Sequence, residues 1–186
     1  MSGDGSLRLG VDLAQRISAE LAEYAMEHDP ERAQAGQDRD VTLLSPDDEL
    51  LAEYDRRIAD SDLRAATRSR FVSKHYADAV EAGVKTLNEC VRARTARTED
   101  GDQLMTIAFS SNGALLRINK GRSKSDESAQ RGHMYLCQGV IGAWRNPRAH
   151  TLVADSPVRT LMMLELINDL VETTKAATRT RKRKKP

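Results

Sequence analysis

The chain has 186 residues, of which 39% are hydrophobic and 4% aromatic, with a formal net charge of +1 at pH 7. This length fits one domain with appendages, and the scarcity of aromatic residues argues against a sheet-rich fold. No apolar run approaches the roughly 20 residues that span a bilayer, and Met1–Asp4 does not resemble an export signal. We therefore expect a cytoplasmic, all-α protein without a membrane partner.

The first expected elements are two N-terminal helices. Apolar residues at helical spacing predict a helix over 11–28, followed by a polar loop over 29–40. Ser45-Pro46-Asp47-Asp48 then combines an N-cap serine, a proline at the first position and acidic residues at the positive end of the helix dipole. This segment predicts a second helix that runs to about Ala59.

The middle of the chain predicts three further helices. Ser61-Asp62 is expected to cap a short helix that runs through Phe71. From Tyr76 to Val91, apolar residues recur at i, i+3, i+4 and i+7, which predicts a long amphipathic helix that ends before Thr98. Residues 103–110 predict a shorter helix, and 115–118 a brief extended segment.

Two apolar helices are expected in the C-terminal part. The first begins at Gln130, and its glycines Gly132, Gly139 and Gly142 suggest close packing of another backbone. The second follows the cap Asp155-Ser156-Pro157 and covers 158–174. Apolar residues surround most of this last helix, so its second face either meets another subunit or lies beneath the N-terminal helices.

Basic residues are concentrated at the C-terminus. Six of the last eight residues are Lys or Arg, while the rest of the chain carries more acidic than basic side chains. Such a tail is either a disordered, solvated end or an attachment point for phosphates. We divide the chain into an N-terminal helical extension (1–60), a helical domain (61–176) and a basic disordered tail (177–186).

The cysteines and histidines do not suggest a metal site. Cys90 and Cys137 fall within apolar helical patterns, which indicates buried, reduced thiols. The four histidines are scattered without ligand spacing, so we expect neither a metal nor a cofactor.

The segment Trp144-Arg145-Asn146-Pro147-Arg148-Ala149-His150 is the best candidate for chemistry. Pro147 is expected to bend the chain and to hold Asn146 extended, which would bring a guanidinium beside an imidazole. Arg70 and His75 have the same spacing without that context, and we interpret them as coincidental. In the structural alternative, Arg145 and Asn146 close a helix and His150 caps the next turn.

Residues 70–175 resemble the HEPN superfamily, in particular its Abi-like branch of conserved hypothetical proteins from bacterial abortive infection and antiphage defence. The resemblance rests mainly on Gly142–His150, supported by His75-Tyr76-x-x-Ala79-Val80, Lys85-x-Leu87 and Gln130-x-Gly132. It implies a helical bundle with catalytic Arg145, Asn146 and His150. It also implies a homodimer whose two motifs line one cleft.

These residues suit metal-independent RNA cleavage. An imidazole can take the proton from a ribose 2′-OH, and a guanidinium can neutralise the charge that grows on the phosphate. We expect a defence or toxin-like endoribonuclease that leaves 2′,3′-cyclic phosphates, with Arg148 binding substrate and a regulatory or neutralising protein partner. The alternative is a catalytically inert module that binds proteins or nucleic acid in a defence assembly. A third possibility is a regulator that binds nucleic acid through its basic tail.

Overall fold

The computed structural model describes residues 45–150 and 153–180. The predicted helix over 11–28, the loop over 29–40 and most of the basic tail lie outside these residues. The described residues belong to one compact unit that begins at Ser45.

The described unit is built from helices, which confirms the all-α prediction. A single short β-ladder accompanies them. The elements are α3 (Pro46–Arg57), α4 (Ser61–Val72), α5 (Tyr76–Thr95), α6 (Gly101–Phe109), β1 (Leu116–Arg117), α7 (Lys124–Val140), the π-helical segment η1 (Ile141–Arg145), α8 (Asn146–His150), α9 (Pro157–Ala176) and β2 (Thr178–Arg179).

The helix starts follow the capping residues that the sequence predicts. The Ser45 side chain accepts a hydrogen bond from Asp48 N–H, and the Ser156 side chain accepts one from Arg159 N–H. A proline follows each serine at the first helical position, where its missing N–H has no cost. For α4 the cap lies one residue earlier than predicted, because the side chain of Asp60 rather than Ser61 accepts the first free N–H groups.

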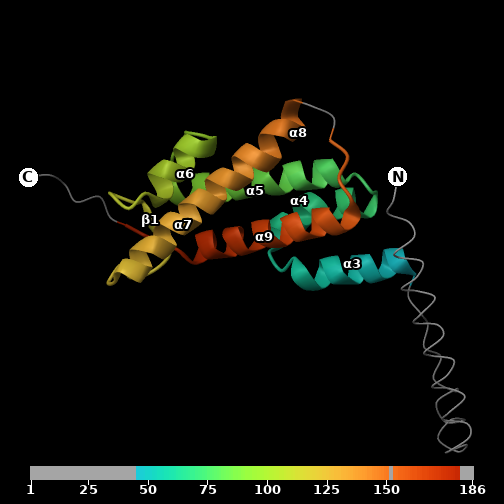
Figure 1. Cartoon of the computed structure of the whole chain (residues 1–186), viewed down its shortest axis with the longest axis horizontal. Helices are drawn as coiled ribbons and strands as arrows, with labels where there is room; N and C mark the ends of the chain where they lie inside the picture. The colour runs from blue at the N-terminus through green and yellow to red at the C-terminus, as the bar shows by residue number, and fades with distance from the viewer. Residues whose placement is uncertain (1–44, 151–152, 181–186) are drawn as a thin grey trace, which may run out of the picture. The chain divides into compact units, whose positions relative to one another are not determined.

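Helix α5 occupies the centre of the unit. It lies alongside α4 and α9, while α7 runs obliquely across α9 (Figure 1). Its predicted apolar stripe is buried, including Val80, Val84, Leu87 and Val91. Gly83 completes this stripe, since a Cβ there would lie only 2.9 Å from Leu164 Cδ2 of α9. The glycine thus sets how closely the two helices approach.

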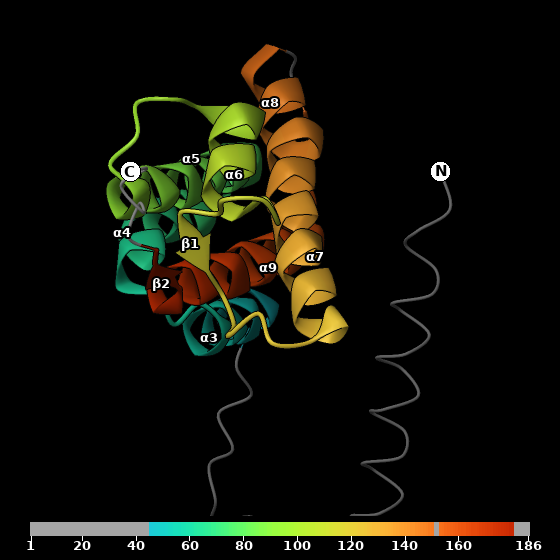
Figure 2. The same ribbon diagram turned by 90° about the vertical axis from the view of Figure 1, so that its left-hand side faces the viewer.

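Helix α9 is mainly a core helix. Leu164, Ile167 and Leu170 are fully buried, and α3 covers part of α9 (Figure 2). Of the two alternatives for its second apolar face, the contact with α3 supports burial beneath an N-terminal helix. Only Val158 and Met162 stay strongly exposed among its large apolar residues.

The predicted boundary at residue 60 lies inside this compact unit. Tyr54 of α3 and Ile58 directly after it are fully buried in the common core. The Tyr54 hydroxyl also lies 2.7 Å from Thr67 Oγ1 of α4. Residues 45–60 are therefore packed with the helices of 61–176, because their apolar side chains help to fill the same core.

A two-stranded ladder joins the segment before α7 to the segment after α9. Leu116 pairs with Arg179 and Arg117 with Thr178 in antiparallel register (Figure 2). The sequence predicts the extended segment at 115–118 but not its partner.

Gln130 holds this ladder against α7. Its buried amide donates to the carbonyls of Phe109 and Leu116 at 3.0 Å each, and its Oε1 accepts from Ile118 N–H at 3.0 Å. The prediction that the helix begins at Gln130 was wrong. Ser123 caps it, and α7 already starts at Lys124.

Candidate functional site at the end of α7

The candidate motif lies on a continuous helical run rather than on a bend. Asn146 has φ −60° and ψ −46°, which is right-handed helical geometry, so the predicted extended conformation before Pro147 was wrong. The run passes from α7 through η1 into α8. In η1 the hydrogen bonds skip one more residue than in an α-helix, and Asn146 N–H accordingly donates to Ile141 C=O.

This wide turn explains how a proline fits there. In an α-helix the proline ring collides with the carbonyl four residues earlier, and the ring offers no N–H. A π-turn displaces those carbonyls, and such turns are frequent at functional sites. The Arg148 side chain supports the same turn, because its Nη1 donates to Trp144 C=O at 2.8 Å.

Arg145 is ion-paired across the fold. Its guanidinium nitrogens lie 3.2 to 3.3 Å from the carboxylate of Asp100, the N-cap of α6. Arg92 of α5 approaches the same carboxylate at 3.4 Å. Burial raises the pKa of Asp100, but the Gly101 N–H and Arg145 outweigh it, so the pKa falls below its ordinary value. Asp100 is therefore a carboxylate that holds Arg145 toward α6.

Asn146 and His150 share one exposed helical face. They are four residues apart in α8, a spacing that places side chains one above the other. Both residues are exposed, whereas the side chain of Arg145 retains 26% of its exposure. The structure thus places Asn146 and His150 on the same face of α8. The Arg145 guanidinium is turned toward Asp100 instead.

Arg148 forms a nearly buried ion pair with Asp155. Its Nε and Nη2 lie 2.8 and 2.5 Å from Asp155 Oδ2, and the side chains of both residues are nearly buried, at 5% and 1% exposure. The predicted substrate-binding role is therefore not supported. This ion pair ties α8 to the segment that leads into α9. No local pattern in the sequence points to either carboxylate partner, Asp100 or Asp155, because both pairs depend on tertiary packing.

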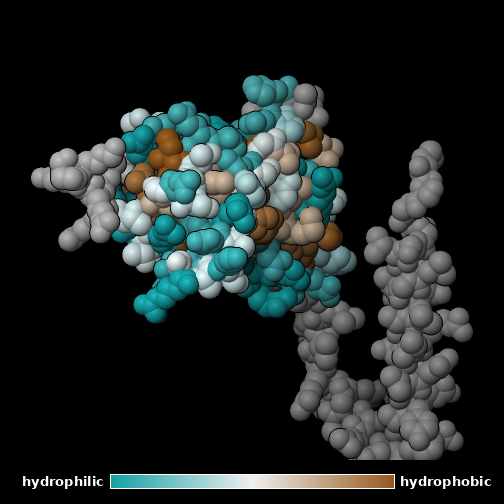
Figure 3. All heavy atoms as spheres, turned by 60° about the vertical axis from the view of Figure 1, so that its left-hand side comes forward, coloured by the Kyte–Doolittle hydropathy of each residue, from teal (hydrophilic) through white to brown (hydrophobic). Residues whose placement is uncertain are grey.

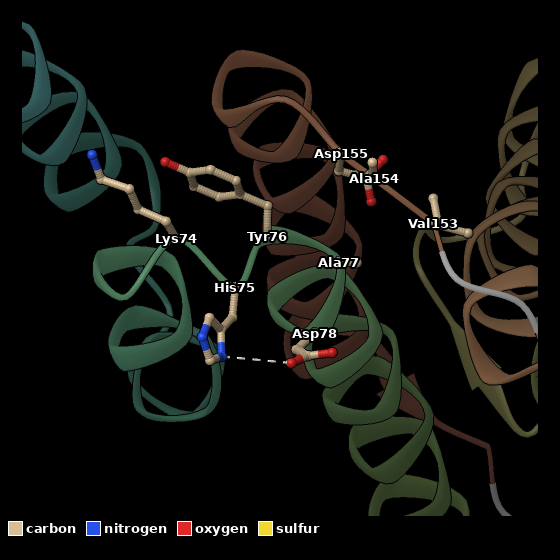
Figure 4. A pocket seen from close by; sticks show the side chains of 8 residues that line it. All are labelled: Lys74, His75, Tyr76, Ala77, Asp78, Val153, Ala154 and Asp155. Carbon is tan, nitrogen blue, oxygen red and sulfur yellow. Dashed lines mark ion pairs between the residues drawn. The ribbon is translucent and has the colours of Figure 1, made fainter.

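A groove of about 420 Å³ lies beside the segment that follows α8. It is lined by the start of α5 and by Val153, Ala154 and Asp155 (Figure 4). His75 lies here with its Nδ1 3.8 Å from Asp78 Oδ2. The Arg70 guanidinium instead donates to Ala66 C=O on its own helix at 2.6 Å. Within the described residues, the lining of this groove includes no member of the Arg145–His150 motif.

His133 is a packing residue. It is buried, its ring meets Phe109 edge-on at 4.7 Å, and its Nε2 lies 3.6 Å from Cys137 Sγ. Burial lowers the pKa of His133 against the opposing effect of Asp169, and burial raises the pKa of Cys137 to about 12. Both side chains are accordingly neutral components of the core at pH 7.

The outer face of α7 is apolar and open. Ala129, Tyr135, Leu136, Gly139 and Ala143 are exposed on it, and Tyr135 and Leu136 retain 57% and 50% exposure. Tan and brown patches lie among the teal on this side of the unit (Figure 3). A Cβ added at Gly132, Gly139 or Gly142 would meet no neighbour within 4 Å. The predicted close packing of another backbone against these glycines is therefore not found within the described unit.

The described residues contain neither a metal-binding cluster nor a membrane-spanning helix. No three His, Cys, Asp or Glu side chains are grouped there as a metal site would require. None of the helices in 45–150 and 153–180 has the length and hydrophobicity to cross a bilayer.

Comparison with known proteins gives one family. The model of the family described as "Protein of unknown function (Hypoth_ymh)" matches residues 57–173, from the end of α3 to the last turn of α9. This is more than half of the chain and includes the complete candidate site. No curated protein and no solved structure matches the chain.

Proposed function

We propose that this chain, which belongs to the Hypoth_ymh family, is a metal-independent endoribonuclease of the HEPN type. The observation that carries the proposal is the exposed pair Asn146 and His150 on α8, directly after Arg145 at the end of a π-turn. The spacing of these three residues is the one that the HEPN resemblance implies. The resemblance also suggests a defence or toxin-like role in the cytoplasm.

The chemistry assigns a different task to each residue. His150 takes the proton from a ribose 2′-OH, and the resulting oxygen attacks the adjacent phosphorus. The bond to the 5′-oxygen of the next nucleotide breaks, and that oxygen takes up the proton that the His150 imidazolium returns. The products are a 2′,3′-cyclic phosphate and a 5′-hydroxyl. Arg145 neutralises the charge on the phosphate, and Asn146 positions it.

The ion pair between Arg145 and Asp100 gives the proposed enzyme a resting state. The guanidinium is occupied by a carboxylate, and an RNA phosphate would have to replace that carboxylate. Exposed ion pairs contribute only about 0.2–1 kcal/mol, so this exchange is inexpensive. A regulatory or neutralising protein would act by stabilising either the ion pair of Arg145 with Asp100 or the contact of Arg145 with the RNA phosphate.

A second copy of this chain is the partner that we propose for the outer face of α7. Arg131 is the one Lys, Arg, Asp or Glu residue between Ser128 and Trp144, so this face lacks the charges of a solvated helix. A two-fold interface requires a surface that complements itself. Here the exposed Leu136 lies one turn from Gly139, which has no side chain and open space around it. Light scattering should show a dimer for the native chain and a monomer for Gly139→Arg, whereas an unchanged mass would exclude this face.

One observation favours the inert alternative, a module that binds proteins or nucleic acid. Both arginines of the motif are engaged by carboxylates, Arg145 by Asp100 and Arg148 by Asp155. If these pairs never open, no guanidinium is available at His150. The module would then present Asn146 and His150 only as part of a binding surface.

The decisive experiment incubates the purified chain with total RNA in excess EDTA and maps the fragment ends. His150→Ala should abolish cleavage, and native products should carry 2′,3′-cyclic phosphates. His75→Ala is the matched control, because His75 is also exposed and follows an arginine at the same spacing. Cleavage of matched DNA, which lacks the 2′-OH, would refute the mechanism. Equal cleavage by native chain and His150→Ala would refute the site.

A further inference from the structure

The β-ladder brings two basic segments together that lie far apart in the sequence. The first is the loop 117–124, which runs from the last residue of β1 to the first residue of α7 and contains four cationic side chains. The second is β2, where Arg179 pairs with Leu116 and its Nη2 donates to Thr95 C=O at 3.4 Å, so this guanidinium does not line the groove between the two segments. The two segments meet at the same end of the unit (Figure 2).

A groove lies between them. Its volume is about 770 Å³, and it runs from the loop to the last turn of α9 and the start of β2. Lys120 and Arg122 are exposed, and Arg117 is half-buried. The residues that line it with polar side chains are Arg117, Asn119, Lys120, Arg122 and Thr178.

These cations have no carboxylate partners in the described unit. No ion pair there involves Arg117, Lys120 or Arg122. The nearest acid along the chain, Asp126, is engaged by the backbone, because its Oδ2 accepts from Arg122 N–H at 2.8 Å. The Asp126 carboxylate offsets one charge, and the segment with Arg117, Lys120, Arg122 and Lys124 keeps a net positive charge.

The loop is held in a defined shape. Asn119 Nδ2 donates to Asp126 C=O at 2.7 Å, and Asn119 Oδ1 accepts from Gly121 N–H at 3.1 Å. Gly121 has φ +61°, and a Cβ there would lie 3.1 Å from Arg117 Nη1. The glycine thus permits both the left-handed turn and the approach of the Arg117 guanidinium. A loop ordered in this way loses little conformational entropy when it binds a ligand.

The basic C-terminal sequence starts from the same place. Thr180 N–H donates to Leu115 C=O at 2.9 Å, and the Thr180 hydroxyl donates to Ala114 C=O at 2.6 Å. The next five residues in the sequence are Arg-Lys-Arg-Lys-Lys. These five residues lie outside the part of the chain that the structure describes.

We infer that the loop 117–124, whose Arg117, Lys120 and Arg122 line this groove, binds the phosphate backbone of RNA. We call this surface the basic groove. It lies apart from the proposed catalytic residues, because the helical run from Lys124 to Arg145 is roughly 30 Å long at 1.5 Å per residue. Phosphate binding is argued from the groove itself, whereas the choice of RNA and the claim that this RNA is also the substrate rest on the proposed function.

The test measures binding of a labelled 20-nucleotide RNA to the full chain carrying His150→Ala, so that binding is separated from cleavage. The loop variant adds Arg117→Gln, Lys120→Gln and Arg122→Gln. For single strands the salt slope is about −0.7 per phosphate contact. Loss of three contacts should therefore reduce the slope by about 2 and weaken binding roughly 100-fold at 0.1 M salt.

The matched control replaces Arg131 and Arg159 with Gln, since both are exposed cations outside the basic groove. It should bind like the parent chain, and all variants should unfold at the same temperature. Equal binding by loop variant and parent overturns the inference, as does binding to anionic vesicles without binding to RNA. If native chain binds RNA through the loop but does not cut it, only the proposed function fails.

Discussion

Arg145 and Asp100 form an ion pair between residues that lie 45 positions apart, with 3.2 Å between Nη1 and Oδ2. This pair links the proposed phosphate-binding guanidinium to the N-cap residue of α6. It determines where the guanidinium points before RNA binds. The pair is also open to a direct test, because asparagine can keep the N-cap hydrogen bond while removing the charge.

We expect Asp100→Asn to increase RNA cleavage. The substitution frees Arg145 from a carboxylate while the cap of α6 is kept, so a phosphate no longer competes with that charge. A pair of this exposure contributes about 0.2–1 kcal/mol, which corresponds to a rate increase of up to about five-fold. The measurement is the initial cleavage rate, with Asp102→Asn as the control because Asp102 is an exposed acid of the same helix turn. A decreased rate at unchanged stability would show that Asp100 assists Arg145 rather than restraining it.

Breaking the buried pair between Arg148 and Asp155 should destabilise the fold strongly. Arg148→Met leaves the Asp155 carboxylate without its cation at 1% exposure, which typically costs about 3–5 kcal/mol. The combination Arg148→Met with Asp155→Leu should recover most of that loss, since no buried charge remains. Urea unfolding measures both variants. If Arg148→Met unfolds like the native chain, Arg148 is free to bind substrate after all.

The stability of the fold should fall as the pH decreases from about 7 toward 5. Burial lowers the pKa of His133 below the value of about 6.5 that histidine has in an unfolded chain. Protonation therefore favours unfolding, so this contribution is present above pH 6.5 and is lost as the pH falls through the folded pKa. The midpoint of urea unfolding, measured across this range, should show the decline.

In His133→Leu this part of the pH dependence should disappear. His75→Ala is the control, because His75 is exposed and its substitution should leave the slope between pH 5 and 7 in place. An unchanged slope in His133→Leu would mean that another group titrates in this range.

The helices of this protein follow from local rules. Ser45-Pro46 and Ser156-Pro157 start helices where capping chemistry predicts, because a cap requires only residues within one turn. The apolar spacing in α5 likewise predicts which side of it is buried. Pro147 is the instructive exception. Its local preference predicts a bend, but the π-turn of η1 makes room for the ring within a continuous helix.

The sequence by itself determined the helical class, most helix starts, the central apolar stripe and the motif at Arg145, Asn146 and His150. These features depend on neighbours in the chain. Only the tertiary structure decided that Asp100 engages Arg145, that Asp155 buries Arg148 and that β2 pairs with β1 next to the loop 117–124. Such pairings join residues that local patterns do not connect, and their energies depend on burial and distance, which no local pattern contains.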